Sequence, residues 1–197
     1  MKSFRICMQN IRKWGSNSRI KMCLIMSFLF VYSYISGMWK IIPLVGEKMN
    51  PWIFPFLLCW RFMKIVFMAP IVFIFCDAPF IDSNQSYVML RTSRKKWCFG
   101  QVLYIYAGSV IYAFVLFFST IIINIGHIKW GTSWGKVLGS AGTSTVLSTL
   151  GINYTTVKVP AIVIRYYTPA QAMFFSFLLM VLSFIFIGLL IYTVNVI

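Results

Sequence analysis

The side chains that could act as acids, bases, nucleophiles or metal ligands are few in this sequence. It has one histidine, His127, and three carboxylates, Glu47, Asp77 and Asp82. They show no pairing typical of acid–base catalysis, and the sequence contains no HExxH, GxSxG or Walker A motif. We interpret His127, at the end of an apolar segment, as an interfacial residue. The sequence therefore predicts a protein that is not an enzyme and that binds no cofactor or metal directly.

The cysteines follow no pattern typical of a zinc site or a disulfide framework. They are odd in number, form no CxxC motif, and three of them lie in or beside apolar runs. The five residues are Cys7, Cys23, Cys59, Cys76 and Cys98. We interpret them as small hydrophobic side chains.

The composition is typical of a membrane protein. Of the 197 residues, 60% are hydrophobic and 11% are charged, whereas a soluble domain is about 45–50% apolar and about 25% charged. Eighteen Lys and Arg against three Asp and Glu give a net charge of +15. Because the basic residues stand beside long apolar runs, the predicted partner is the lipid bilayer and no nucleic acid. A soluble enzyme and a disordered chain are both excluded.

The apolar segments predict an all-α, polytopic membrane protein with about four transmembrane helices. A crossing helix needs about 20 mostly apolar residues, and three segments meet this directly. The fourth is interrupted by Arg61 and Lys64, which we expect to share one face at the outer end of the second span. Interfacial anchoring is their simpler role, and a place in a polar pathway is the alternative. The predicted spans are 22–39, 62–80, 102–126 and 173–197.

The basic residues predict the orientation of these spans. Clusters within 2–21 and 91–96 lie directly beside span ends, and such clusters stay in the cytoplasm. We therefore expect a multi-pass protein of the cell membrane with both termini inside. Residues 22–197 form the predicted transmembrane domain.

The inner segments carry two further predictions. Residues 1–21 are basic with interspersed apolar side chains, which indicates an interfacial amphipathic helix that Gly15–Ser18 ends, or a frayed basic tail. The loop at 81–101 has capping residues, then apolar side chains, then a basic run, and is either a docking segment for another protein or a solvated loop. The loop residues singled out are Asp82, Ser83, Tyr87, Met89, Leu90, Arg91 and Arg94.

The outer segments are expected to carry local structure of their own. Residues 127–171 are too many for a structureless connection in a compact domain. Within them, Val157–Ile164 is apolar and β-branched, which indicates a strand or an interfacial helix. Residues 51–60, rich in tryptophan and proline, are expected in or dipping into the outer interface.

Three stretches resemble the permease subunit of bacterial ABC-2-type exporters. They are FCDAPF (Phe75–Phe80), RTSRKKWCFGQVLYIY (Arg91–Tyr106) and WGTSWGKVLGS (Trp130–Ser140). Permeases of this family end the second span with D-x-PF, begin the third with R-T-x-R-x-x-W, and often carry a tryptophan–glycine pair outside. The resemblance covers roughly residues 50–140.

The resemblance implies a working assembly. Residues 1–21 would be the elbow helix, and residues 81–93 would hold the coupling helix that docks on a separate cytoplasmic ABC ATPase subunit. ATP would be bound by that ATPase, and a second permease copy or paralogue would complete the transporter. Since such permeases typically have six spans, the resemblance also implies a short or truncated relative.

Two other interpretations remain open on the sequence. One is a non-transporting membrane protein, such as an immunity or regulatory factor that binds a peptide or a membrane partner through its outer segment. The other is a lipid-surface or scaffold protein, which only the basic N-terminal segment favours. The first of these would need no coupling loop, which separates it from the permease.

Overall fold

The computed structural model describes residues 2–79, 93–142 and 157–196. Within these ranges the chain is helical, apart from turns, extended connections and one isolated parallel bridge between Met49 and Ile128. Three helical segments are long and apolar enough to cross a membrane: Ser18–Val45, Arg94–His127 and Pro169–Val196. The predicted all-α class and the membrane character are therefore supported by the structure.

The three long helices begin before their apolar stretches. Helix α2 covers Ser18–Ser36, α6 covers Arg94–Asn124 and α10 covers Pro169–Val196. The spans were predicted to start at residues 22, 102 and 173, so these helices start four, eight and four residues earlier. Arg, Lys and Gln are good helix formers, and charge therefore marks the expected membrane edge rather than the end of the helix. The predicted loop 81–101 was wrong in its second part for this reason, because residues 94–101 are helical.

The predicted span 62–80 corresponds to a shorter helix. Helix α4 covers Arg61–Phe75 and has 15 residues, about 22 Å at 1.5 Å per residue, against a hydrocarbon core of about 30 Å. Arg61 and Lys64 lie in its first turn and are exposed. Their spacing of three places them on neighbouring parts of one face, as predicted.

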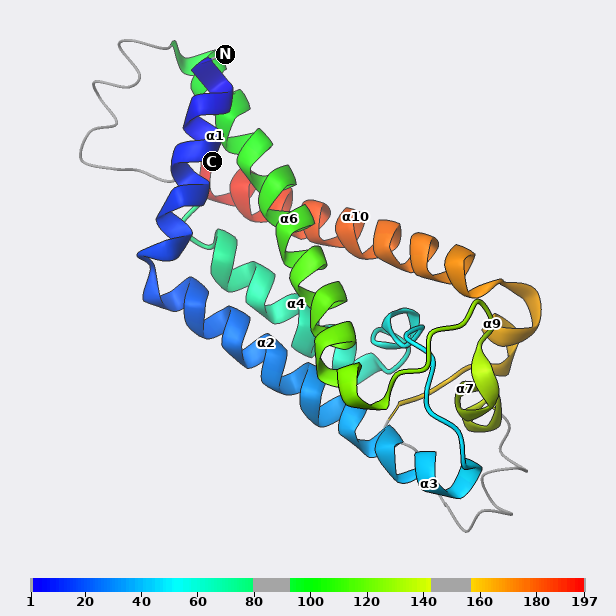
Figure 1. Cartoon of the computed structure of the whole chain (residues 1–197). Coiled ribbons are helices and arrows are strands. Elements are labelled where there is room, and N and C mark those ends of the chain that lie inside the picture. Colours follow the sequence, from blue (N-terminus) through cyan, green and yellow to red (C-terminus); the bar gives the residue numbers. More distant parts are fainter. Residues whose placement is uncertain (1, 80–92, 143–156, 197) are drawn as a thin grey trace. The chain divides into compact units, whose positions relative to one another are not determined.

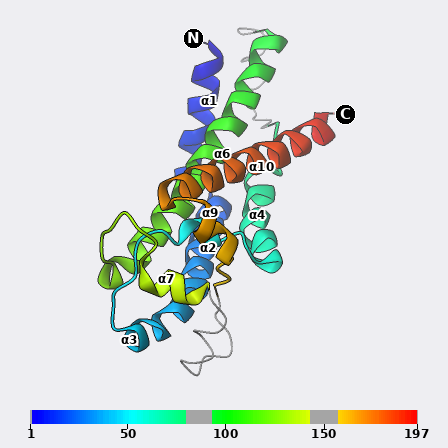
Figure 2. The ribbon, with the colours of Figure 1, turned by 90° about the vertical axis from the view of Figure 1, so that its right-hand side faces the viewer.

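The contacts divide the chain into two compact units. Unit 1 comprises Met1–Met26, Met68–Phe114 and Met180–Ile197, and unit 2 comprises Ser27–Phe67 and Val115–Leu179. Figures 1 and 2 show the helices coloured along the sequence. Helices α2, α4, α6 and α10 each contribute one part to each unit. We describe each unit by itself.

In unit 1, the N-terminal helix α1 (Lys2–Arg12) packs along the first turns of α6. The Ser3 hydroxyl donates to the Lys96 carbonyl at 2.9 Å, and the Asn10 amide donates to Gln101 at 3.1 Å. A Cβ on Gly100 would lie 3.0 Å from the Ile6 Cβ, so glycine favours this close approach. The helix and the break after Gly15 agree with the sequence prediction, and the interfacial position of α1 stays a prediction.

The core of unit 1 is built around Phe75, the last residue of α4. Its side chain is fully buried and meets the Tyr104 ring edge-on at 5.7 Å between centroids. A Cβ on Gly108 of α6 or Gly188 of α10 would lie 3.0 Å from a Phe75 ring atom. The two glycines therefore make the space that the Phe75 ring fills.

In unit 2, the segment before α4 is buried in protein. Phe54 packs against Phe117 and Phe177, at 5.4 and 6.2 Å between ring centroids, and Phe56 packs against Trp134 at 5.4 Å. Tight turns around Phe54–Phe56 bring these rings inward. Residues 51–60 were expected in or dipping into the interface. The structure shows that residues 53–57 have a protein environment, which is where irregular backbone is tolerated in a membrane protein.

Two tryptophan–glycine pairs of the sequence, Trp130–Gly131 and Trp134–Gly135, lie in unit 2. The Trp52 indole donates to the Gly131 carbonyl at 2.8 Å, and the Asn50 amide donates to the Ser133 carbonyl at 2.5 Å. A Cβ on Gly135 would lie 2.9 Å from Asn50. Residues 131–135 therefore bind the segment that begins at Asn50 through the contacts of Asn50 and Trp52.

Short helices complete unit 2. They are α3 (Ile42–Val45), α7 (Gly135–Ala141) and α9 (Ala161–Tyr166). Val157–Ile164 was predicted to form a strand or an interfacial helix, and its second half is helical in α9. Lys136 of α7 donates to Glu47 at 2.8 Å and holds the pKa of that carboxylate below its ordinary value.

Candidate functional site

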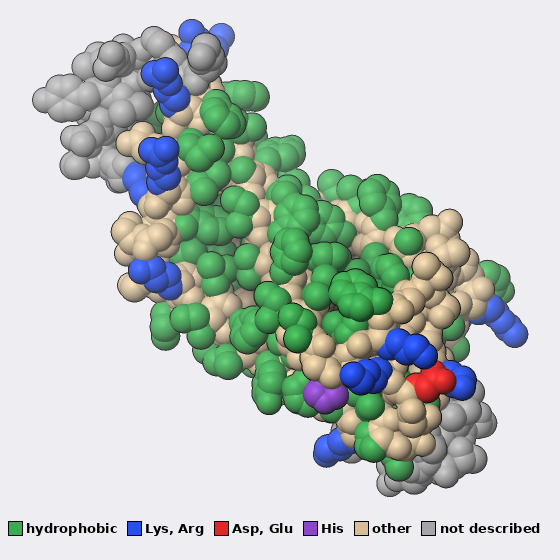
Figure 3. Space-filling view, viewed as in Figure 1, with side chains coloured by type: hydrophobic (Ala, Val, Ile, Leu, Met, Phe, Trp, Pro, Cys, Tyr) green, Lys and Arg blue, Asp and Glu red, His purple; other side chains and the backbone are tan. Residues whose placement is uncertain are grey.

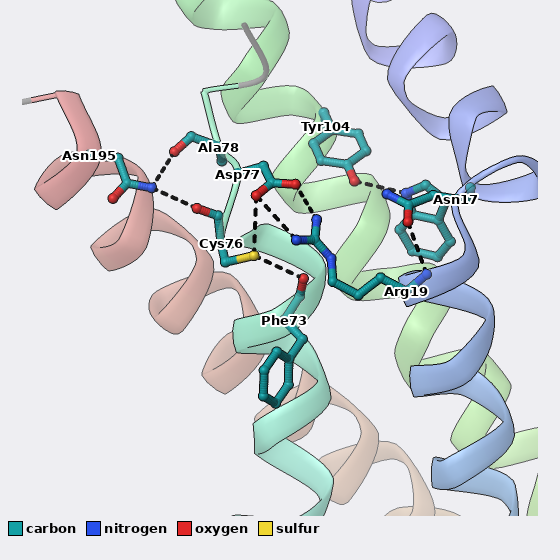
Figure 4. Close-up of polar contacts among 9 residues, drawn as sticks. Asn17, Arg19, Phe73, Cys76, Asp77, Ala78, Tyr104 and Asn195 are labelled. Atoms are coloured by element: carbon teal, nitrogen blue, oxygen red, sulfur yellow. Dashed lines mark hydrogen bonds and ion pairs between the residues drawn. The ribbon is translucent and has the colours of Figure 1, made fainter.

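The most connected polar cluster of unit 1 surrounds residues 76–78, directly after α4. Asp77 accepts hydrogen bonds from both terminal nitrogens of Arg19 on α2, and the Nη1–Oδ1 distance is 3.2 Å (Figure 4). This forked arrangement is the strong, directional form of an Arg–carboxylate pair. Asp77 is one of three carboxylates in the chain, and the pair neutralises it at the end of an apolar helix.

Helix α10 holds the same segment from another side. The Asn195 amide donates to the carbonyls of Cys76 and Ala78, at 3.0 and 2.6 Å. These carbonyls follow the end of α4, where backbone acceptors have no helical partner. The single S–H of Cys76 is shared between the Phe73 carbonyl and Asp77 Oδ1, which lie 3.3 and 3.4 Å from the sulfur. Residues 76–78 are thus fixed through backbone and side chain together.

A second pair of contacts positions the Arg19 side of the cluster. The Arg19 N–H donates to the Asn17 side chain at 3.0 Å, which caps the start of α2. The Trp14 indole donates to the Tyr104 hydroxyl at 2.8 Å, and these two rings meet edge-on. Because Tyr104 also packs on Phe75, the turn Lys13–Gly15 that follows α1 meets α2, α4 and α6 at this site, as Figure 4 shows in part.

The chemistry of this cluster is that of an anchor. The Asp77 carboxylate is already engaged by a guanidinium and a thiol, which leaves it poorly placed to take a proton from a substrate. Within 2–79, 93–142 and 157–196, no three His, Cys, Asp or Glu side chains gather as metal ligands would. The cluster therefore fixes the backbone just before residues 80–92.

The residues singled out from the sequence are placed as follows. Arg94 is the exposed first residue of α6, and Arg61 and Lys64 are exposed in unit 2, so neither of that pair belongs to the cluster. The remaining loop residues lie outside the described ranges: Asp82, Ser83, Tyr87, Met89, Leu90 and Arg91.

The sequence analysis did not single out Arg19, Tyr104 or Asn195. Arg19 was counted only as an inner charge that sets topology. The available signal was Asp77 itself, because a carboxylate at the end of an apolar helix needs a cation or hydrogen-bond donors. That requirement predicts that a partner exists without saying which of the basic residues it is.

With this geometry established, the chain was compared with known proteins. It matches no protein-family model, and neither the curated proteins nor the solved structures gave a significant match.

Exchanging the charges of the Arg19–Asp77 pair tests the anchor. Asp77→Arg is expected to lower the free energy of unfolding by about 1–2 kcal/mol, since it puts two cations together where a part-exposed pair was worth about 1. Adding Arg19→Asp is expected to restore most of the loss. Thermal unfolding in one detergent measures both variants.

The Glu47–Lys136 pair of unit 2 gives the control, because it has a single contact where the Arg19–Asp77 pair is forked. Glu47→Lys reverses the charge of an ion pair at the surface, and we expect almost no change in the unfolding midpoint. An equal loss for Asp77→Arg and Glu47→Lys, or no recovery in the exchanged double variant, would contradict the anchor.

Proposed function

We propose that the protein is the membrane-spanning permease subunit of an ATP-driven ABC exporter, coupled through residues 81–93 to a separate cytoplasmic ATPase. The resemblance of the three stretches to ABC-2-type permeases supports this. So does the membrane character of the three long helices. In this proposal the ATPase supplies the ATP chemistry, and a second permease copy or paralogue completes the transporter.

The observation that carries the proposal is that unit 1 holds both flanks of residues 80–92. On one side, Asp77 and Ala78 are bound by Arg19 and Asn195. On the other side, the Lys96 carbonyl is bound by Ser3 of α1. A segment fastened at both ends passes a displacement to the helices that hold it, which is what a coupling loop requires.

The proposal includes four crossings. Helix α4 with the residues up to 80 makes the second, and α2, α6 and α10 make the others. The N-terminus lies in the cytoplasm, since that places residues 80–92 and both basic clusters inside. Accessibility of single cysteines to a membrane-impermeant maleimide in intact cells and in lysed cells tests this topology.

Substitution in the loop tests the function. Leu90→Ala with Arg91→Glu is expected to abolish co-purification of an ABC ATPase from the native membrane, because it removes an apolar contact and reverses a charge. Arg61→Glu with Lys64→Ala is the matched control, because it makes the same kinds of change at exposed residues of unit 2 that lie outside residues 81–93. This variant should leave co-purification of the ATPase intact. Capture of an ATPase by the wild type and the control but not by the loop variant is the expected result.

Two outcomes would contradict the proposal. One is that the wild-type protein captures no ATPase from its own membrane. The other is that the loop variant captures it as well as the wild type does. Biological activity that survives Leu90→Ala with Arg91→Glu would instead favour the non-transporting immunity or regulatory protein.

A further inference from the structure

Two basic segments that are far apart in the sequence lie side by side in unit 1. Ser3 contacts Lys96, Asn10 contacts Gln101 and Trp14 contacts Tyr104, over 93, 91 and 90 residues of chain. The nearly constant separation means that α1 and α6 run in the same direction, as Figures 1 and 2 show. Both helices therefore begin at the same end of unit 1.

This arrangement places two groups of exposed cations on neighbouring helices of unit 1. The first turns of α1 and α6 contain no acidic residue. Five basic side chains are exposed and make no ion pair within the described part of the chain. They are Arg5 and Arg12 on α1, and Arg94, Lys95 and Lys96 on α6, and we call them the basic surface. Figure 3 shows Lys and Arg side chains following the edge formed by α1.

The basic surface is bordered by exposed apolar side chains on the same helix. Phe4 is 58% exposed and Met8 is 39% exposed. Their spacing of four puts them on one face of α1, and the spacing of seven between Arg5 and Arg12 puts those two on the adjacent face. The third face of α1 is taken by its packing on α6, through Ile6 and Asn10.

We propose that the basic surface binds the head groups of anionic phospholipids, with Phe4 and Met8 inserted beside them at the level of the acyl chains. Each Lys or Arg near an anionic membrane surface strengthens binding to it, so five together favour anionic over zwitterionic lipid. A soluble anion would satisfy the cations but not the apolar side chains. A lipid satisfies both, because charge and hydrocarbon meet at the same depth. This proposal concerns a lipid ligand and does not depend on transport.

Hydrogen exchange of the full-length protein in nanodiscs tests the proposal. The probes are phosphatidylcholine alone and phosphatidylcholine mixed with phosphatidylglycerol. Amides of residues 2–12 are expected to exchange at least about tenfold more slowly in the mixed discs, since two or more engaged cations stabilise α1 by about 1 kcal/mol each. Arg5→Gln with Arg12→Gln should remove much of this difference, and so should the triple change Arg94→Gln, Lys95→Gln and Lys96→Gln.

Matched controls keep the result specific. Lys48→Gln with Lys129→Gln removes two exposed cations of unit 2 and is expected to leave the lipid effect intact. Unchanged exchange of residues 104–114 shows that unit 1 is still folded in each variant. Equal exchange of α1 in both kinds of disc would overturn the proposal, and so would an equal response of the control variant. The same protection from inorganic phosphate in phosphatidylcholine discs would overturn it as well, because the ligand would then be a soluble anion.

Discussion

Phe75→Ala is expected to lower the free energy of unfolding by about 2–4 kcal/mol, the largest effect among the packing changes considered. Removing a buried phenylalanine from a soluble core costs about 3–5 kcal/mol. In a membrane part of that cost is absent, because lipid is as apolar as the core and only packing is lost. Phe75 is fully buried against Tyr104 and two glycines, so little around it can collapse into the space. Thermal or denaturant unfolding in a fixed detergent measures the change.

Phe73→Ala is the matched control for this experiment. It removes the same ring from the same helix, two residues earlier, but Phe73 is 55% exposed. We expect its effect to stay within about 0.5 kcal/mol, as for surface substitutions. A similar loss for both variants would mean that Phe75 is not the centre of unit 1.

A second-site change sharpens the result. A Cβ on Gly108 would lie 3.0 Å from the Phe75 ring in the intact protein, so Gly108→Ala alone is expected to destabilise unit 1. In the Phe75→Ala background the contacts of this methyl group with the ring are gone, and the Trp14 Cζ2 atom at 3.2 Å is the close neighbour that stays. The two substitutions should therefore couple, with the double variant more stable than the sum of the single effects predicts.

Gly135→Ala is expected to lower the stability of unit 2 by about 2–3 kcal/mol. Gly135 has φ +73°, a left-handed conformation that costs an L-residue roughly 1–2 kcal/mol. The added Cβ would also lie 2.9 Å from the Asn50 side chain, which is held by the Ser133 carbonyl. Faster proteolysis of the segment around residues 127–142, together with a lower unfolding midpoint, is the expected observation.

Gly139→Ala provides the control within the same short helix. Nothing lies within 4 Å of a Cβ added at Gly139, and its backbone is not left-handed. Alanine is a better helix former than glycine by about 0.5–1 kcal/mol, so this variant should be neutral or slightly more stable. If the two alanine substitutions behave alike, the close approach of Gly135 to Asn50 does not hold unit 2 together.

Much of the fold was accessible from the sequence because it depends on local properties. Hydropathy predicted the three long helices. The residues Gly15–Ser18 predicted the break that separates α1 from α2. Helices α2, α6 and α10 begin before the predicted spans, because helix-forming basic and polar residues continue each helix beyond its apolar stretch. The second span was predicted over 62–80 by extending a short uncharged stretch at both ends, whereas α4 ends at Phe75 and is followed by a hydrogen-bonded turn.

The candidate site was much less accessible, because its contacts join residues that are far apart in the chain. Arg19 and Asp77 are separated by 58 residues, and Asn195 lies 117 residues from Ala78. The sequence contains eighteen basic residues and three carboxylates, so it does not say which basic residue pairs with which carboxylate. Only the packing of helix faces selects one of them.

The sequence by itself determined the membrane-protein character, the helical class and the two basic clusters beside the predicted spans. Composition and periodicity carry this information along the chain, without reference to which residues meet. The tertiary structure decided which residues meet. It paired Arg19 with Asp77, placed Phe75 between two glycines, and brought the two basic clusters together along α1 and α6. The physical reason is that an ion pair or a close packing contact depends on the separation of two side chains in space, which the chain sets only when its helices have packed.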